Sequence, residues 1–165
     1  MPCAKRASNM VSKPRLFLDT STLFSGIWSA EGGARMLLRL GEAEVVQLLI
    51  SPQVLREIEE VVRRKAAKYL PALAVLIDRS HAGVVAAAPQ TLLERCQGMV
   101  AHPGDAQILA DAWYSQAGFL VTLDRAHFLG TPGLASQLSF LLGTPGDCLA
   151  WLRAQLIDLS TPPLN

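Results

Sequence analysis

The stretch RLFLDTST, residues 15–22, decides the fold, because it reads as a short buried strand that ends in an acid. Its apolar run, Leu16–Leu18, is brief and is followed at once by polar residues, a pattern typical of a strand. The pattern returns at residues 119–123, where FLVTL precedes Asp124. Functional groups of a parallel sheet gather at the carboxyl ends of its strands. We therefore expect Asp19 and Asp124 to share one edge of such a sheet.

Helices and further short strands alternate with these two units. Ser51 is a favoured helix cap and Pro52 suits the first helical position, so a helix is predicted to start there. Alternation of this kind predicts an α/β fold, a three-layer α/β/α sandwich with a central parallel sheet. Trp28 is predicted to lie exposed in a polar loop flanked by glycines. The predicted helices cover residues 34–40, 52–65, 71–79, 89–97, 105–116 and a terminal segment from 144–146 to before Pro162, and the further strands cover 45–50, 83–88 and 138–142.

The composition indicates one folded domain. Half of the 165 residues are apolar and 18% are charged, which excludes a disordered chain. The net charge is +1, so any site for a polyanion must be a local patch and not a property of the whole surface. We expect residues 1–14 to form a flexible tail and residues 15–165 to form the domain.

The cysteines and the hydropathy predict a cytoplasmic protein. Cys3, Cys96 and Cys148 are widely spaced and form no CxxC pair, which favours reduced thiols. The N-terminus is polar and basic and lacks the apolar segment of a secretory signal. No run of 18 apolar residues occurs, so no membrane span is expected.

Two further acids are expected at the same edge of the sheet. Asp105 stands at a predicted helix start, and Glu57 stands in the second turn of the helix that begins at Pro52. Helices in this architecture start where the strands end, so these acids should meet Asp19 and Asp124. Each acid also has a simpler interpretation: Asp105 as a helix cap, and Glu57 as one charge of a solvated helix face.

Converging carboxylates repel one another, and burying them together is costly unless a cation or protons neutralise them. A site made only of oxygen ligands suits Mg²⁺ or Mn²⁺ better than zinc. Such an ion can position and activate water against a phosphodiester. The sequence thus predicts a metal-dependent phosphodiesterase.

Several stretches of the chain resemble the successive motifs of PIN domains, and the similarity is closest to bacterial toxin components of toxin–antitoxin pairs. It extends over roughly residues 15–157. The stretches are RLFLDTSTLFSG (15–26), LLISPQVLREIEEVVRR (48–64), GDAQILADAW (104–113), FLVTLDRAHFL (119–129) and SFLLGTPGDCLAWL (139–152).

The resemblance implies a ribonuclease that uses Mg²⁺ or Mn²⁺ and leaves 5′-phosphate and 3′-hydroxyl ends. By motif, Asp19, Asp105 and Asp124 would hold the metal directly or through water. Glu57 would bind a second ion or orient the attacking water, and Thr122 would hydrogen-bond the cluster. The resemblance also implies an RNA substrate, a protein antitoxin that covers the cleft, and a homodimer.

Two positions depart from the family pattern. Ser21 stands where many members have Asn, and Leu123 fills the middle of a motif that usually reads T-G-D. Neither change removes a carboxylate. The Ser21 change bears on how the loop after the first strand is held.

Positive and aromatic residues near these motifs are candidate RNA contacts, with solvated charges or local ion pairs as the simpler interpretation. The candidates are Arg125, Arg15, Arg35 and Trp28, the last of which would equally suit a dimer contact. His102 and His127 lie near the candidate site segments, and each is interpreted as a surface or capped histidine, with a catalytic base as the alternative.

Two other functions stay open on the sequence alone. A strand-end Asp19 suits a phosphohydrolase that forms an aspartyl phosphate, although the second Asp usual two residues later is replaced by Ser21. The other alternative is a non-catalytic PIN fold that binds RNA or protein.

Overall fold

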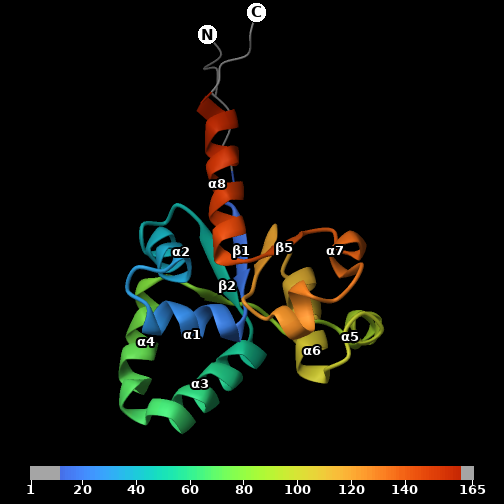
Figure 1. Cartoon of the computed structure of the whole chain (residues 1–165), viewed down its shortest axis with the longest axis horizontal. Coiled ribbons are helices and arrows are strands. Elements are labelled where there is room, and N and C mark those ends of the chain that lie inside the picture. The colour runs from blue at the N-terminus through green and yellow to red at the C-terminus, as the bar shows by residue number, and fades with distance from the viewer. Residues whose placement is uncertain (1–11, 161–165) are drawn as a thin grey trace, which may run out of the picture.

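The computed structural model describes residues 12–160, and Figure 1 shows a central sheet with helices on both sides. The sheet has the strand order β3-β2-β1-β4-β5, and every neighbouring pair is parallel. The predicted α/β fold with a parallel sheet is therefore confirmed. The strands are β1 (Arg15–Leu18), β2 (Gln47–Ile50), β3 (Gly83–Val84), β4 (Phe119–Val121) and β5 (Leu141–Gly143).

The helices fill the connections between the strands. They are α1 (Thr20–Trp28), α2 (Gly33–Glu42), α3 (Pro52–Ala66), α4 (Leu70–Arg79), α5 (Gln90–Gln97), α6 (Pro103–Tyr114), α7 (Leu134–Gln137) and α8 (Pro145–Ser160), with a 3₁₀ turn η1 (Ala67–Tyr69) and a π-helical turn η2 (Arg125–Leu129).

The core lies on both faces of the central strands. In β1, Leu16, Phe17 and Leu18 are all fully buried, because β2 and β4 pair with β1 on its two sides and helices cover both faces. A strand buried on both faces reads as a continuous apolar run, which is why RLFL identified it from the sequence.

Residues 20–28 form a helix where a loop was predicted for Trp28, so that prediction was wrong. Asp19 caps the helix, since its side chain accepts a hydrogen bond from the Thr22 amide, and Trp28 is the last helical residue. Thr, Ser and Gly are weak helix formers, so α1 is hardly visible in the local sequence. Packing stabilises it instead, because Gly26 is buried against Leu38 of α2.

Several predicted boundaries were too long. β3 covers only residues 83–84 because it pairs with just two residues of β2, and β5 starts at Leu141, three residues later than predicted. η2 and α7 were not predicted. Contacts with the body begin before Arg15: Lys13 forms an ion pair with Glu44. Residues 1–11 of the predicted tail lie outside the described part of the chain.

Cys96 and Cys148 are buried and free, whereas Cys3 lies outside the described residues. None of the described helices is long and apolar enough to cross a membrane.

Candidate active site

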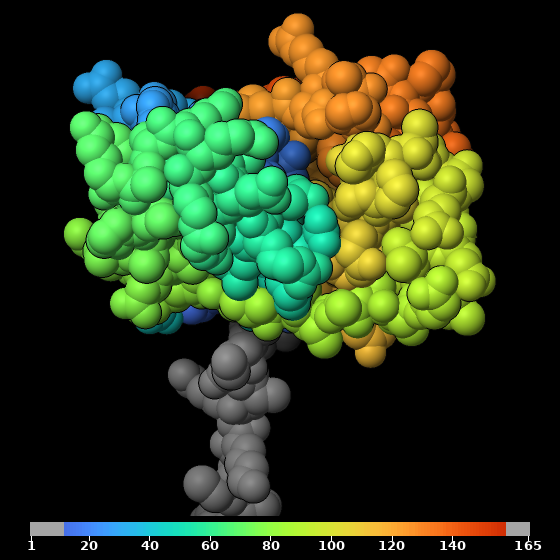
Figure 2. All heavy atoms as spheres, turned by 90° about the horizontal axis from the view of Figure 1, so that it is seen from below, coloured from blue at the N-terminus to red at the C-terminus, as the bar shows by residue number. Residues whose placement is uncertain are grey.

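The four predicted acids line one pocket at the carboxyl edge of the sheet. Asp19 follows β1 directly, and its amide donates to the Val121 carbonyl at the end of β4. Helices α3 and α6 contribute Glu57 and Asp105. Figure 2 shows this face hollowed between the green segment that holds α3 and the yellow segment that holds α6. The cavity measures about 260 Å³ and is lined by Asp19, Thr20, Ser21, Phe24, Glu57, Val61, Asp105, Ile108, Asp124 and Phe128.

Asp19 is the most buried acid of the pocket, with 3% of its surface exposed. Thr122 Oγ1 donates to its Oδ2 at 2.5 Å, and the Thr22 amide donates to its Oδ1 at 2.9 Å. Burial raises the pKa of Asp19, and these hydrogen bonds offset part of that rise. Asp19 is thus held in place by a set of donors that favour its ionised form.

Ser21 has a visible role in holding the loop after β1. Its hydroxyl lies 2.8 and 2.9 Å from the two Asp19 oxygens, and it accepts a hydrogen bond of 2.9 Å from the Leu123 amide. The residue that replaces the usual Asn therefore ties the loop after β1 to the segment after β4. Leu123 is exposed, and its side chain is not among the residues that line the pocket.

Glu57 is oriented by two neighbours. Thr20 Oγ1 donates to its Oε2 at 2.7 Å, and Gln53 Nε2 donates to its Oε1 at 2.6 Å. Because Thr20 belongs to α1, the first contact joins α1 to α3 at the pocket wall. Glu57 is therefore a fixed wall of the pocket, unlike its exposed neighbours Glu59 and Glu60.

Asp105 does not cap α6. The cap is His102, whose Nδ1 accepts a hydrogen bond from the Gly104 amide. The Oδ2 atom of Asp105 is buried and has no hydrogen-bond partner among the described residues. Burial raises the pKa of Asp105, and the charges of Asp124 and Glu57 raise it further, while the two nearby histidines lower it. The nearest cationic groups to Asp105 Oδ2 are His102 Nδ1 at 3.8 Å and His127 Nδ1 at 3.7 Å, beyond hydrogen-bond distance, so this oxygen still has room for a ligand.

Asp124 and His127 form a local unit on η2. Asp124 Oδ1 accepts hydrogen bonds from the Ala126 and His127 amides, and its Oδ2 lies 2.8 Å from His127 Nδ1. Burial raises the pKa of Asp124, but the bonds from His127 and Ala126 outweigh it and bring this pKa below its ordinary value. The bond to Asp124 and the charge of Asp105 raise the pKa of His127.

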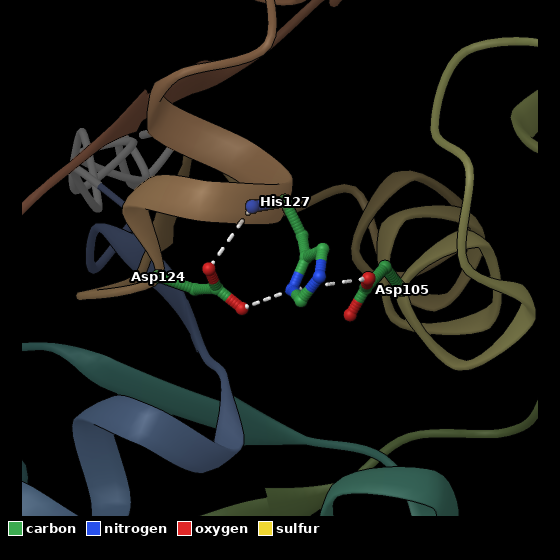
Figure 3. A group of neighbouring side chains, drawn as sticks. All are labelled: Asp105, Asp124 and His127. Atoms are coloured by element: carbon green, nitrogen blue, oxygen red, sulfur yellow. Dashed lines mark hydrogen bonds and ion pairs between the residues drawn. The ribbon is translucent and has the colours of Figure 1, made fainter.

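Figure 3 shows the His127 ring between Asp124 and Asp105, with its Nδ1 3.7 Å from Asp105 Oδ2. Among the described residues, these three each offer one ligand atom within 4.8 Å of the others. Carboxylate oxygens with one imidazole suit Mn²⁺ or Mg²⁺, and the Asp105 oxygen that accepts no hydrogen bond from the described residues gives such an ion a ligand. The residues therefore fit a divalent metal.

The compact ligand group differs from the predicted set in two respects. It contains His127, and the other predicted ligands, Asp19 and Glu57, line the same pocket outside the group. From the sequence His127 was interpreted as a surface or capped histidine or, alternatively, a catalytic base, and not as a metal ligand. No local sequence signal singles it out as a ligand, because its place beside Asp124 depends on the π-helical turn η2.

The predicted RNA contacts fall into two sets. Arg125 is exposed directly after Asp124, and Trp28 ends the helix whose first turns line the pocket. Arg15 stands at the opposite end of β1 from Asp19, where it donates to the Ser115 carbonyl at 2.7 Å. Arg35 donates to the Gly26 carbonyl at 2.9 Å and lines a different hollow. Arg15 and Arg35 therefore take no part in the pocket.

Solved structures share this fold at low sequence identity. VapBC2 from Rickettsia felis bound to a promoter DNA fragment is 19% identical, with a TM-score of 0.59 over 78% of this chain and 98% of that chain. DNA-bound VapBC from Salmonella typhimurium is 18% identical, with a TM-score of 0.59 over 79% and 98%. PAE2754 from Pyrobaculum aerophilum is 18% identical, with a TM-score of 0.55 over 87% and 99%.

Among curated proteins, no sequence matches this chain significantly. A family model described as PIN domain matches residues 15–126, about two thirds of the chain. The matched stretch runs from β1 to η2 and includes all four acids of the pocket. With the parallel sheet and the acid-lined pocket at its edge, this match places the chain in the PIN-domain family.

Proposed function

We propose that this protein is an endoribonuclease that hydrolyses RNA phosphodiester bonds with the help of Mg²⁺ or Mn²⁺. One observation carries the proposal: the buried Oδ2 atom of Asp105, which accepts no hydrogen bond from the described residues, lies beside Asp124 in a pocket that also holds Asp19 and Glu57. Like charges gathered in this way are stabilised by a cation bound between them. Phosphodiesterases are among the enzymes that use such an ion on a polyanionic substrate.

Asp105, Asp124 and His127 would hold the ion, and the negative charge of Asp19 would add to the attraction. When bound, a divalent ion stabilises the charge that develops on the phosphate and lowers the pKa of water. Glu57, fixed by Thr20 and Gln53, is the base for this reaction. A carboxylate oxygen of Glu57 takes a proton from water as the water oxygen attacks phosphorus. The bond from phosphorus to the 3′ oxygen breaks, and that oxygen takes a proton from solvent water, to which Glu57 returns the proton that it took.

The burial of Asp19 argues against an aspartyl-phosphate phosphohydrolase. A nucleophilic carboxylate needs a free oxygen that can reach the substrate. Both Asp19 oxygens accept hydrogen bonds, and the residue is nearly inaccessible. A hydrolysis by activated water makes no such demand on Asp19.

We further propose that the protein acts in the cytoplasm as the toxin of a toxin–antitoxin pair, as a homodimer whose cleft a protein antitoxin covers. The similarity in fold to two VapBC structures supports this part of the proposal. A small overlapping upstream reading frame that encodes a DNA-binding protein would favour the toxin role. The proposed homodimer is tested separately, by measuring the mass of the purified protein with light scattering.

The test of the nuclease is cleavage of end-labelled single-stranded RNA with Mg²⁺, with Mn²⁺ and with a chelator. We expect cleavage that needs the metal and falls by roughly 100-fold or more in Asp19→Asn, Asp105→Asn and Glu57→Gln. Asp78→Asn, an exposed acid on α4, is the matched control and should cleave normally.

Two results would count against the proposal. Equal cleavage by the parent and the Asp105→Asn protein would identify a contaminating nuclease. Metal and RNA binding without cleavage of any RNA would favour the non-catalytic alternative.

A further inference from the structure

Helices α1 and α3 present two matching rows of side chains that start in the acidic pocket and run away from it. Along α1 the row is Thr20, Phe24 and Trp28, and along α3 it is Glu57, Val61 and Lys65. Spacings of four and eight residues keep each row near one helix face. We call these rows, continued by Lys68 and Tyr69 of η1, the α1–α3 seam.

Contacts hold the two rows together from the pocket outward. At the pocket, Thr20 Oγ1 donates to Glu57 Oε2 at 2.7 Å. One turn further, Phe24 and Val61 both line the pocket wall. Beyond them, Lys65 Nζ lies 4.8 Å from the centre of the Phe24 ring. The seam is thus continuous with the candidate active site.

The outer part of the seam is aromatic and open to solvent. Phe24 and Trp28 stack with their ring centres 4.7 Å apart and their planes 16° from parallel, and the Tyr69 ring follows at 5.2 Å from Trp28. Trp28 is 48% exposed and Tyr69 is 42% exposed. Core aromatics bury their faces, whereas these two rings leave much of their surface in water.

Positive charge accompanies the rings. Lys68 Nζ lies 5.2 Å from the centre of the Tyr69 ring, and Arg64 and Lys65 are exposed in the last turn of α3. Arg63, by contrast, forms an ion pair with Glu59. The local charge is positive in a chain whose net charge is only +1. Exposed rings interleaved with lysines are the combination that binds single-stranded nucleic acid.

From these observations we propose that the α1–α3 seam binds the unpaired bases of single-stranded RNA next to the bond that is cut; this inference rests on the proposed nuclease function. From Thr20 to Trp28 the helix rises by about 12 Å. That length corresponds to about three nucleotides at a stacked spacing of about 3.4 Å. Bases within a duplex are already stacked on one another, so the seam selects unpaired RNA.

The test measures RNA binding apart from cleavage. The probe is a fluorescein-labelled 12-nucleotide single strand, compared with a duplex of the same sequence, and binding is followed by anisotropy in the Asp105→Asn background. We expect Trp28→Ala and Tyr69→Ala each to weaken binding of the single strand by roughly 5- to 100-fold. Trp28→Phe and Tyr69→Phe keep a ring and should bind within about 3-fold of the parent.

Controls come from the other end of the molecule. Tyr114 is 52% exposed at the far end of α6, so Tyr114→Ala should bind like the parent.

Replacing both Lys65 and Lys68 with Ala should make the slope of log affinity against log salt shallower, by about 0.7 for each phosphate that is no longer neutralised. Lys13→Ala, which removes a lysine paired with Glu44, should leave that slope unchanged.

Three results would overturn the seam proposal. The first is unchanged RNA affinity in both Trp28→Ala and Tyr69→Ala, and the second is equal affinity of the parent for the single strand and the duplex. The third is a change in the oligomer mass of these variants, measured by light scattering, while their RNA affinity is intact. The last would make the seam a protein contact. If the parent cuts no RNA while Trp28→Ala still weakens binding and Trp28→Phe does not, the nuclease proposal fails, and the seam stands only as a surface that binds single-stranded RNA.

Discussion

Asp19 and Asp105 are both carboxylates of the pocket, yet their surroundings differ in kind. Asp19 accepts hydrogen bonds on both oxygens, so its cost of burial is largely offset within the protein. Asp105 Oδ2 is buried without a hydrogen-bond donor among the described residues, and its nearest cationic groups are the His102 and His127 rings at 3.8 and 3.7 Å. Asp19 therefore organises the loops around the pocket, and Asp105 is the residue whose charge a ligand must satisfy.

Two thiols allow a prediction about pH. Burial raises the pKa of Cys96 to about 11 and that of Cys148 to about 12. In the unfolded chain a thiol loses its proton near pH 8.5, at about the ordinary value. The folded protein holds more protons above that pH, so the thiols' contribution to stability is intact below about pH 8.5 and is lost as pH rises toward 11.

We expect the free energy of unfolding in urea to fall more steeply with alkaline pH in the parent than in a Cys96→Ala, Cys148→Ala double variant. The difference should approach about 1.4 kcal/mol per pH unit for each thiol. Cys3 is present in both proteins and cancels. Parallel slopes from about pH 8.5 to about pH 10.5 would contradict the prediction.

Single residues also show where sequence reasoning reaches its limit. Asp19 and Asp124 were found because each follows a buried strand, and strand ends are visible in the hydropathy. His127 was not found, because its role depends on the π-helical turn that folds it back over Asp124. Such a turn has no periodicity over five residues, so only the coordinates place the ring between two carboxylates.

At the scale of elements, α1 marks the same limit. The sheet strands are short apolar runs and were predicted, as was α3 with its cap and its apolar stripe. The segment TSTLFSGIW has weak helix propensity and is helical because α2 and α3 pack against it. The α1–α3 seam was invisible for this reason: its spacing of four residues has meaning only once residues 20–28 are helical.

Close packing of α2 against the sheet gives a prediction for one glycine. A Cβ at Gly41 would lie 2.5 Å from the Ser80 carbonyl oxygen and would also clash with Leu48 Cδ1. Ala is the better helix former by about 1 kcal/mol, so propensity alone would favour Gly41→Ala. The backbone contact cannot give way easily, and we expect a net loss of about 1–3 kcal/mol of stability.

The matched control is Gly146→Ala in the first turn of α8, where a Cβ meets only Thr144 Oγ1 at 3.6 Å. This variant should be neutral or slightly stabilised. The melting temperature of a domain of this size changes by about 2–4 °C per kcal/mol of stability, so calorimetry separates Gly41→Ala from Gly146→Ala. Equal melting temperatures would show that α2 shifts to admit the methyl group.

For the molecule as a whole, the net charge hides the arrangement of charges. Acids gather at the carboxyl edge of the sheet, and cations gather at the end of α3. The sum is +1, and composition alone gave no sign of a polyanion site. Topology produces the separation, because parallel strands collect their following residues at one edge.

That concentration of acids predicts how the whole domain responds to metal. An ion that binds only the folded state stabilises it by about 2.7 kcal/mol at 100 times its dissociation constant. The melting temperature should then rise by roughly 5–10 °C when Mn²⁺ or Mg²⁺ is added to chelator-treated protein. We expect Asp105→Asn to lose most of this rise and Asp78→Asn to keep it.

The melting temperature measured in chelator, without metal, shows whether repulsion between carboxylates destabilises the folded protein. If carboxylate repulsion opposes folding, Asp105→Asn should melt at a higher temperature than the parent in chelator, since it removes one buried charge near Asp124 and Glu57. A lower melting temperature in chelator would mean that His102 and His127 already compensate the charge of Asp105. An unchanged response of Asp105→Asn to Mn²⁺ would place the ion away from the pocket and remove the observation on which the nuclease proposal depends.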